Sequence, residues 1–153
     1  MTKLLLGIDD AGRGPVIGCM VLAGVLIKKE SEQDILKDGV KDSKLLTAKQ
    51  RTNLAELIKN KASAYCVQLI TPAEIDTGFG EGLNLNQVEA LVSAKIINDL
   101  TSRLTESEKE ELKIIIDCPS VNISAWKEQV LHYVREKNLA KIIHCEHKAD
   151  FNH

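Results

Sequence analysis

Apolar residues along the chain fall into short blocks separated by polar and glycine-containing segments. Blocks of five to ten apolar residues bounded by Gly, Pro, Asp or Lys are typical of strands. Segments with apolar residues three and four positions apart are typical of helices. The first pattern predicts strands over 3–9, 17–27, 64–70, 113–117 and 140–145.

The helical pattern is clearest in the second half of the chain. It predicts a long helix over 85–104 and a shorter one over 123–134. A capping box at Thr47 begins an earlier helix, in which Leu54, Leu57 and Ile58 form a stripe that we expect to be buried. Proline at the first helical position after Thr71 signals another start, which we expect the glycines of 76–82 to break.

The order of these elements predicts the class of fold. The first three strands can form an antiparallel meander, whereas helical crossovers make the later strands parallel. We therefore expect an α/β fold with a mixed five-stranded sheet flanked by helices.

Length and composition fit one ordinary globular domain. The chain has 153 residues, of which 44% are hydrophobic and 27% are charged. Its apolar runs fall short of the roughly 20 residues that span a bilayer, and the acidic pair at 9–10 interrupts the layout of a signal peptide. The cysteines are far apart with no CxxC pair, which favours buried free thiols over structural zinc; they are Cys19, Cys66, Cys118 and Cys145. We expect a cytoplasmic protein.

Acidic residues recur at the ends of predicted strands. Asp9 and Asp10 follow one apolar run, Asp117 follows another, and Asp150 comes shortly after the last. Strand ends gather at one edge of an open α/β sheet, where clustered carboxylates repel one another unless a cation compensates them. Oxygen ligands suit Mg²⁺ or Mn²⁺. Two such ions can activate water and stabilise the leaving oxygen of a phosphodiester.

Taken singly, two of these acids have simpler interpretations. Asp117 precedes Cys-Pro-Ser and suits a turn or helix cap, and Asp150 suits a solvated surface. The adjacent pair Asp9 and Asp10 gives no such local stability, and the recurrence of the pattern favours one shared site.

Two loops carry positive charge near this pattern. Gly12 and Gly14 allow the backbone to approach a ligand closely, and Arg13 between them offers charge and donors for phosphate. Ser43 and Lys44 belong to a second loop, which is open to two interpretations: contact with a nucleic-acid backbone, or exposure to water. The net charge of −2 gives no overall basic footprint.

Four segments in this order resemble ribonuclease HII, most closely its archaeal branch: "GIDDAGRGPVIG", "KDSKLL", "IIIDCPSVN" and "CEHKAD". The resemblance implies an RNase H-like catalytic domain over 1–153 that lacks the family's C-terminal helical region. It also implies hydrolysis of RNA in RNA–DNA hybrids and cleavage at ribonucleotides embedded in duplex DNA. Cleavage on the 5′ side of the ribonucleotide would leave a 3′-hydroxyl and a 5′-phosphate, a reaction that serves ribonucleotide removal in DNA replication and repair.

The resemblance also implies roles for individual residues. A two-metal site for Mg²⁺ or Mn²⁺ would be held by the four acids, which are Asp9, Asp10, Asp117 and Asp150. The partner would be an RNA–DNA hybrid or a duplex with an embedded ribonucleotide, whose 2′-hydroxyl distinguishes RNA from DNA. The loop expected to read that hydroxyl comprises Gly12, Arg13 and Gly14, and the residues expected to contact substrate beside it are Ser43, Lys44 and Lys148.

The chain departs from the family in two respects. The family has Asp-Glu where this chain has Asp9-Asp10, so the second carboxylate reaches one methylene less far. The family also continues beyond the fourth acid with a helix bearing a tyrosine, which neither Tyr65 nor Tyr133 matches in position. We therefore expect an open apolar sheet face near 141–145 that leads to self-association, binds a partner or is covered by a rearranged helix.

Three functions remain in view. The first is an active junction or hybrid ribonuclease, and the second is a hybrid-binding protein with weakened or lost catalysis. The third is a fragment that needs a partner chain. Retention of all four carboxylates favours the enzyme.

Overall fold

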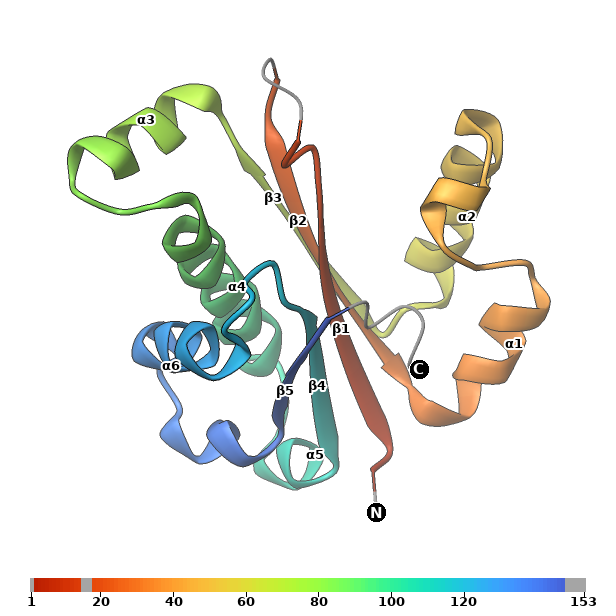
Figure 1. Ribbon diagram of the computed structural model, residues 1–153. Coiled ribbons are helices and arrows are strands. Elements are labelled where there is room, and N and C mark those ends of the chain that lie inside the picture. The colour runs from red at the N-terminus through yellow and green to blue at the C-terminus, as the bar shows by residue number, and fades with distance from the viewer. Residues whose placement is uncertain (1, 15–17, 148–153) are drawn as a thin grey trace.

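A computed structural model describes residues 2–14 and 18–147, which are built around a five-stranded sheet with strand order β3-β2-β1-β4-β5 (Figure 1). The antiparallel pairs are β1–β2 and β2–β3, and the parallel pairs are β1–β4 and β4–β5. This arrangement confirms the mixed sheet expected from the element order. The strands are β1 (Leu4–Ala11), β2 (Met20–Lys28), β3 (Ala64–Ile70), β4 (Leu112–Asp117) and β5 (Ile143–Glu146).

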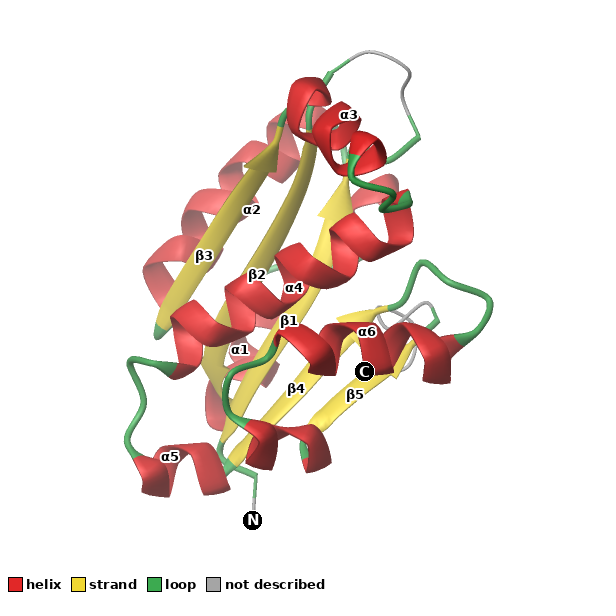
Figure 2. Ribbon diagram, turned by 90° about the vertical axis from the view of Figure 1, so that its left-hand side faces the viewer, coloured by secondary structure: helices red, strands yellow, loops and turns green. Residues whose placement is uncertain are grey.

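Helices lie on both sides of the sheet. In Figure 1, α4 and α6 lie on one side, and α1 and α2 lie on the other. Figure 2 shows α4 and α6 in front of the sheet and α2 behind it. Short 3-10 helices occupy 29–31, 43–45 and 137–141. The α-helices are α1 (Glu32–Lys37), α2 (Ala48–Lys61), α3 (Pro72–Gly80), α4 (Leu85–Thr101), α5 (Glu106–Glu110) and α6 (Ile123–Tyr133).

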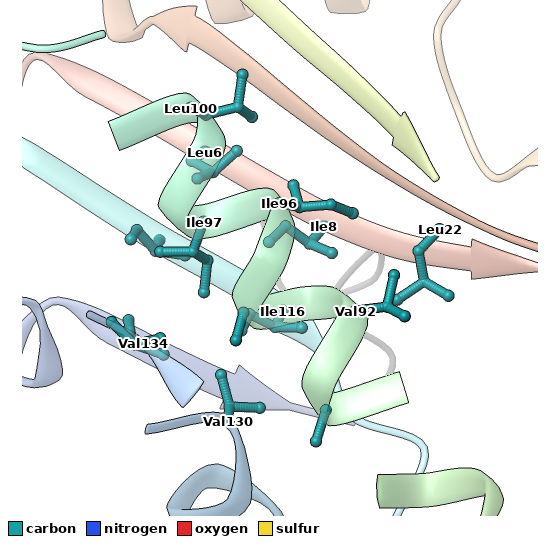
Figure 3. Packing of buried hydrophobic residues seen from close by; sticks show 14 of the residues in the cluster. Leu6, Ile8, Leu22, Val92, Ile96, Ile97, Leu100, Ile116, Val130 and Val134 are labelled. Carbon is teal, nitrogen blue, oxygen red and sulfur yellow. The ribbon is translucent and has the colours of Figure 1, made fainter. Parts of the chain in front are cut away.

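The hydrophobic core lies between α4 and the middle of the sheet. Figure 3 shows side chains of α4 packed over those of β1, β2 and β4. Close approach depends on Gly24 of β2, because a Cβ added there would lie 2.3 Å from Cγ2 of Ile96. The labelled residues of this layer are Leu6, Ile8, Leu22, Val92, Ile96, Ile97, Leu100, Ile116, Val130 and Val134, all of them buried.

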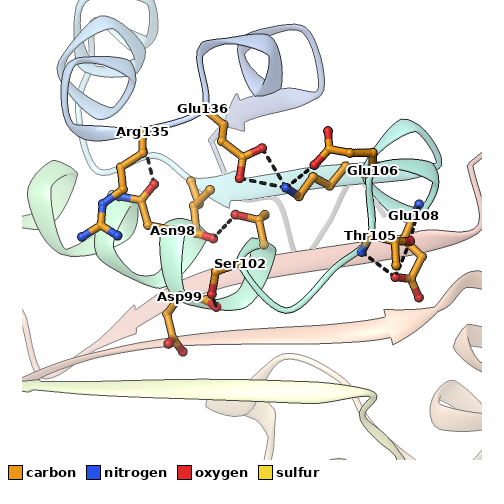
Figure 4. Close-up of polar contacts among 11 residues, drawn as sticks. Asn98, Asp99, Ser102, Thr105, Glu106, Glu108, Arg135 and Glu136 are labelled. Atoms are coloured by element: carbon orange, nitrogen blue, oxygen red, sulfur yellow. Dashed lines mark hydrogen bonds and ion pairs between the residues drawn. The ribbon is translucent and has the colours of Figure 1, made fainter.

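Polar contacts fix the ends of α4 and α6 relative to each other (Figure 4). The side-chain amide of Asn98 donates to the main-chain oxygen of Tyr133 at 3.1 Å, and its Oδ1 accepts from the main-chain nitrogen of Arg135 at 2.9 Å. Nearby, the ammonium group of Lys109 contacts Glu106 at 2.8 Å and Glu136 at 2.9 Å. These contacts hold the chain that leads from α6 towards β5.

The other side of the sheet is more open than the sequence predicts. No residue of α2 is buried, and the expected stripe of Leu54, Leu57 and Ile58 is only half-buried. A row of exposed apolar side chains on this side belongs to β3 and comprises Tyr65, Val67 and Leu69. An open face is expected from the sequence near 141–145, but Ile143 is buried because it packs in the core with residues of α4 and α6.

Several elements differ from the prediction. Helix α3 continues to Gly80, because its capping box at Thr71 stabilises the start and Gly78 packs closely against Val88 of α4. The last strand begins at Ile143 rather than at 140, because a 3-10 helix occupies the preceding residues. The sequence prediction does not include helix α5, although Thr105 and Glu108 form a capping box at its start. Within 2–14 and 18–147, no helix is both long and apolar enough to cross a bilayer.

Candidate active site

The acids of β1 and β4 lie at the same end of two neighbouring parallel strands. Ile8 is paired with Ile116, so Asp9 and Asp117 follow at equivalent positions, and neighbouring strands run about 5 Å apart. Strand β1 continues past the predicted end to Ala11, which places the acidic pair inside the strand, opposite β2. Together Asp9, Asp10 and Asp117 border one pocket at this edge of the sheet.

Burial and charged neighbours together set the pKa of Asp10. Burial raises the pKa of its carboxyl group, and the negative charge of Asp117 raises it further. The positive charges of Arg13 and Lys44 oppose this shift in pKa. Asp10 also donates from its main-chain nitrogen to Oδ1 of Asp9 at 2.7 Å, which fixes one carboxylate beside the other.

The glycine–arginine loop begins directly after β1. Gly12 has a φ of +79°, and a Cβ at this position would lie 2.6 Å from the main-chain oxygen of Cys19. Only glycine fits both conditions without strain. Gly14, in contrast, has open space around it. The turn therefore brings Arg13 back towards α4.

The structure adds a functional candidate that the sequence analysis missed, namely Glu89 of α4. Its side chain borders the same pocket as the acids and is only 2% exposed. Nε of Arg13 lies 2.8 Å from its Oε1. Burial raises the pKa of Glu89 to about 7, with Arg13 opposing the shift and Asp10 adding to it. An acid inside the apolar stripe of 85–104 is the sequence signal that points to this residue.

The second loop places one of its two predicted residues near the acids. Lys44 is close enough to Asp10 to lower its pKa, and Ser43 is exposed at the start of the same 3-10 helix. Two contacts shape this loop: Asp42 accepts from the main-chain nitrogen of Lys44 at 2.9 Å, and Arg51 donates to the main-chain oxygen of Leu46 at 2.7 Å. The predicted residues Lys148 and Asp150 lie outside the described residues.

The donor set at this edge suits a hard divalent cation. Asp9, Asp10 and Asp117 offer carboxylate oxygens, the ligands that Mg²⁺ and Mn²⁺ prefer. Burial is the main cause of the raised pKa of Asp10, and a cation beside this carboxyl group would favour its charged form. Across the described residues, no group of three or more His, Cys, Asp or Glu side chains is arranged to hold a metal ion. The residues present therefore fit part of a metal site.

Comparison with known proteins agrees with this geometry. Residues 6–153 match the sequence profile of ribonuclease HII. The chain is 37% identical over 151 residues to ribonuclease HII of Methanocaldococcus jannaschii, covering 96% of this chain and 64% of that protein. It is 36% identical over 146 residues to ribonuclease HII of Methanothermobacter thermautotrophicus, covering 95% of this chain and again 64% of the relative.

Solved structures show the same architecture. Ribonuclease H2 of Pyrococcus horikoshii superposes with a TM-score of 0.79 at 30% identity, covering 98% of this chain and 65% of that one. RNase HII of Archaeoglobus fulgidus, solved in complex with PCNA, gives a TM-score of 0.78 at 29% identity with the same coverage. A Bst-RNase HIII solved with Mn²⁺ shares the fold, with a TM-score of 0.76 at 20% identity over 98% of this chain and 47% of that one.

The sheet topology and these likenesses define the class of protein: an RNase H-like α/β fold with acids at the carboxyl ends of its central strands. Within that class, the chain belongs to the ribonuclease HII family. It spans slightly less than two thirds of the length of the curated relatives described above.

Proposed function

We propose that this chain is a divalent-metal-dependent endoribonuclease that cuts RNA in RNA–DNA hybrids and at single ribonucleotides embedded in duplex DNA. One observation carries the proposal: three carboxylates border one pocket at the ends of neighbouring strands, with a glycine–arginine loop beside them. Membership in the ribonuclease HII family supports it. The reaction would serve removal of ribonucleotides during DNA replication and repair.

Each group of residues has a part in this proposal. Asp9, Asp10, Asp117 and Asp150 would hold Mg²⁺ or Mn²⁺. When bound, the ions supply activation of water and stabilisation of the departing 3′-oxygen. The arginine of the 12–14 loop contributes charge beside the acids, and the loop's main-chain N–H groups are available to the 2′-hydroxyl.

Substrate binding would depend on local charge, because the net charge of the chain is −2. Lys44 lies close to Asp10 and is exposed, so it can contact a phosphate next to the scissile bond. We propose that Ser43 of the same loop and Lys148 beside the fourth acid contact the sugar–phosphate backbone of the same substrate.

A nicking assay tests the proposal. The substrate is a labelled DNA duplex with one internal ribonucleotide, incubated with the protein and either Mg²⁺ or Mn²⁺. We expect one nick on the 5′ side of the ribonucleotide, with a 3′-hydroxyl and a 5′-phosphate, and no cleavage of an all-DNA duplex of the same sequence. Asp9→Asn is the matched negative control.

The alternative is a hybrid-binding protein without turnover, which the shorter Asp10 favours because family members have Glu there. Folded protein that binds the ribonucleotide duplex but leaves it uncut with both metals would establish that alternative and reject the enzyme.

A further inference from the structure

One edge of the Arg13 guanidinium is held by α4. Its Nη2 donates to Oδ1 of Asn86, and its Nε lies 2.8 Å from Oε1 of Glu89. Nε and Nη2 form the side edge of the planar group, so the amide oxygen of Asn86 and the ion-paired carboxylate of Glu89 face that edge together. Asn86 and Glu89 are three residues apart and therefore lie on one side of the helix. Nη1 takes part in neither contact.

A glutamate at position 89 lowers the stability of the fold relative to an apolar residue, because its carboxylate is buried. Its side chain is 2% exposed, between the buried Val88 and Ala90 of the same helix, whereas the side chain of Arg13 is 35% exposed. A buried carboxylate lowers stability unless it is paired. An apolar residue would serve packing better, so the position of Glu89 beside Arg13 and the acids indicates a role in the site.

The turn of α4 that holds Arg13 is itself fixed on two sides. Asn84 and Gln87 form a capping box, with Oδ1 of Asn84 accepting from the main-chain nitrogen of Gln87 at 3.0 Å. The main-chain oxygen of Asn86 accepts from Nε1 of Trp126 in α6 at 2.9 Å. Asn86 and Glu89 thus stand on a rigid support, which is what precise placement of a ligand-binding group needs.

We propose that Glu89, together with Asn86, is a positioning residue that sets the orientation of Arg13 and so determines the preference for ribonucleotides. This inference rests on the proposed function, in which the 12–14 loop meets the 2′-hydroxyl. Asn86 and Glu89, which we call the clamp, hold the side edge of the guanidinium and leave Nη1 outside it. Without the clamp, Arg13 samples several rotamers and the loop loses its fixed shape.

Two variants separate the charge of the Glu89 side chain from its shape. Glu89→Gln keeps the length and one acceptor oxygen but loses the charge, and it removes the cost of a buried carboxylate. Glu89→Ala removes the acceptor. We expect the ribonucleotide preference to fall in the order wild type, Gln and Ala, because each step weakens the hold on Nε.

The experiment measures dissociation constants by fluorescence anisotropy in EDTA, which prevents cleavage. Two duplexes of one sequence are compared at matched salt, one all-DNA and one with a single ribonucleotide. For Glu89→Ala we expect the preference for the ribonucleotide to fall roughly tenfold, with affinity for all-DNA duplex unchanged. Thr101→Val is the matched control, because Thr101 is a buried polar residue at the far end of the same helix.

A double variant tests whether Glu89 acts through Arg13. In an Arg13→Lys background, Glu89→Ala should cause no further loss of preference, since the clamped edge is already gone. If folded Glu89→Gln and Glu89→Ala proteins keep the wild-type preference, the positioning role is wrong while the proposed function stands. If the wild type itself binds both duplexes equally, reading of the 2′-hydroxyl by the loop fails, and the positioning role fails with it.

Discussion

The indole Nε1 of Trp126 donates to the main-chain oxygen of Asn86 at 2.9 Å, which joins α6 to the first turn of α4. Trp126 is almost fully buried and borders the same pocket as the acids. The two helices that cover one side of the sheet therefore meet beside the candidate site. Packing of this layer and placement of Arg13 depend on the same contact.

Removing this hydrogen bond should weaken the fold measurably. Trp126→Phe keeps an aromatic ring but removes the indole donor and leaves a small void, so we expect the free energy of unfolding to fall by about 2–4 kcal/mol. Urea denaturation measures the change. Tyr133→Phe is the control, because Tyr133 is an exposed aromatic residue of the same helix and should change stability little. Equal stability of both variants would contradict the structural importance of the bond.

The two glycines of the loop should respond differently to alanine. At Gly12, alanine would meet the oxygen of Cys19 and adopt a positive φ, so Gly12→Ala should lower the free energy of unfolding by roughly 1–3 kcal/mol. Gly14→Ala has open space and should leave stability within about 0.5 kcal/mol of the wild type. Thermal or urea unfolding of the pair compares them directly. A loss of stability in Gly14→Ala equal to that in Gly12→Ala would show that the turn is not as described.

Glu89 should make stability depend on pH. Burial raises the pKa of this carboxyl group from 4.5 to about 7, so the folded protein binds the proton more tightly than the unfolded chain does. The resulting stabilisation is complete below about pH 4.5 and is lost as the pH rises through about 7. Glu89→Gln cannot titrate. Between about pH 4.5 and pH 8, its free energy of unfolding should therefore gain about 3 kcal/mol relative to the wild type.

Urea denaturation at several pH values measures this difference. The pKa of Asp10 is also raised, which gives a slope of the same sign in both proteins and largely cancels in the comparison. Parallel stability profiles for Glu89→Gln and the wild type would show that Glu89 does not carry the raised pKa.

The exposed row on β3 should promote self-association. Tyr65, Val67 and Leu69 are 44%, 54% and 60% exposed and lie on an edge strand, which offers unpaired backbone groups to a second copy of the chain. We expect the sedimentation coefficient to rise with protein concentration. The double variant Val67→Lys, Leu69→Lys should remain folded and monomeric. Association that persists in this variant would place the contact elsewhere.

The sequence predicts the sheet well because each strand is a local pattern. Ile8 and Ile116 belong to short apolar runs, and the aspartate after each run can be identified from its neighbours in the sequence alone. Glu89 could not be assigned in the same way, because its partner Arg13 is distant in the sequence and meets it only when α4 packs on β1 and β2. A glutamate in a helix is ordinarily a solvated residue.

Other differences arise from tertiary packing. Glycine usually disfavours helix, yet Gly78 fits α3 because a side chain there would press on Val88 of α4. The apolar stripe of α2 predicts burial, but amphipathicity does not say how closely a helix approaches the sheet, and Leu57 stays half-buried. The role of each acid depends on side-chain chemistry that the pattern alone does not establish.

The acids themselves give the most direct test of the proposed enzyme. Asp9→Asn and Asp117→Asn keep shape and remove charge, so each should lower the nicking rate at least 100-fold if the oxygens hold metal. Both residues are at least partly exposed to solvent, so the fold should survive. Asp150→Asn is expected to match them. Asp10→Glu should instead raise metal affinity, because the added methylene restores the reach that the family's acidic pair has. The readouts are the nicking rate and its dependence on Mn²⁺ concentration. Nicking by Asp9→Asn at the wild-type rate would remove Asp9 from the site and with it the shared metal site on which the mechanism rests.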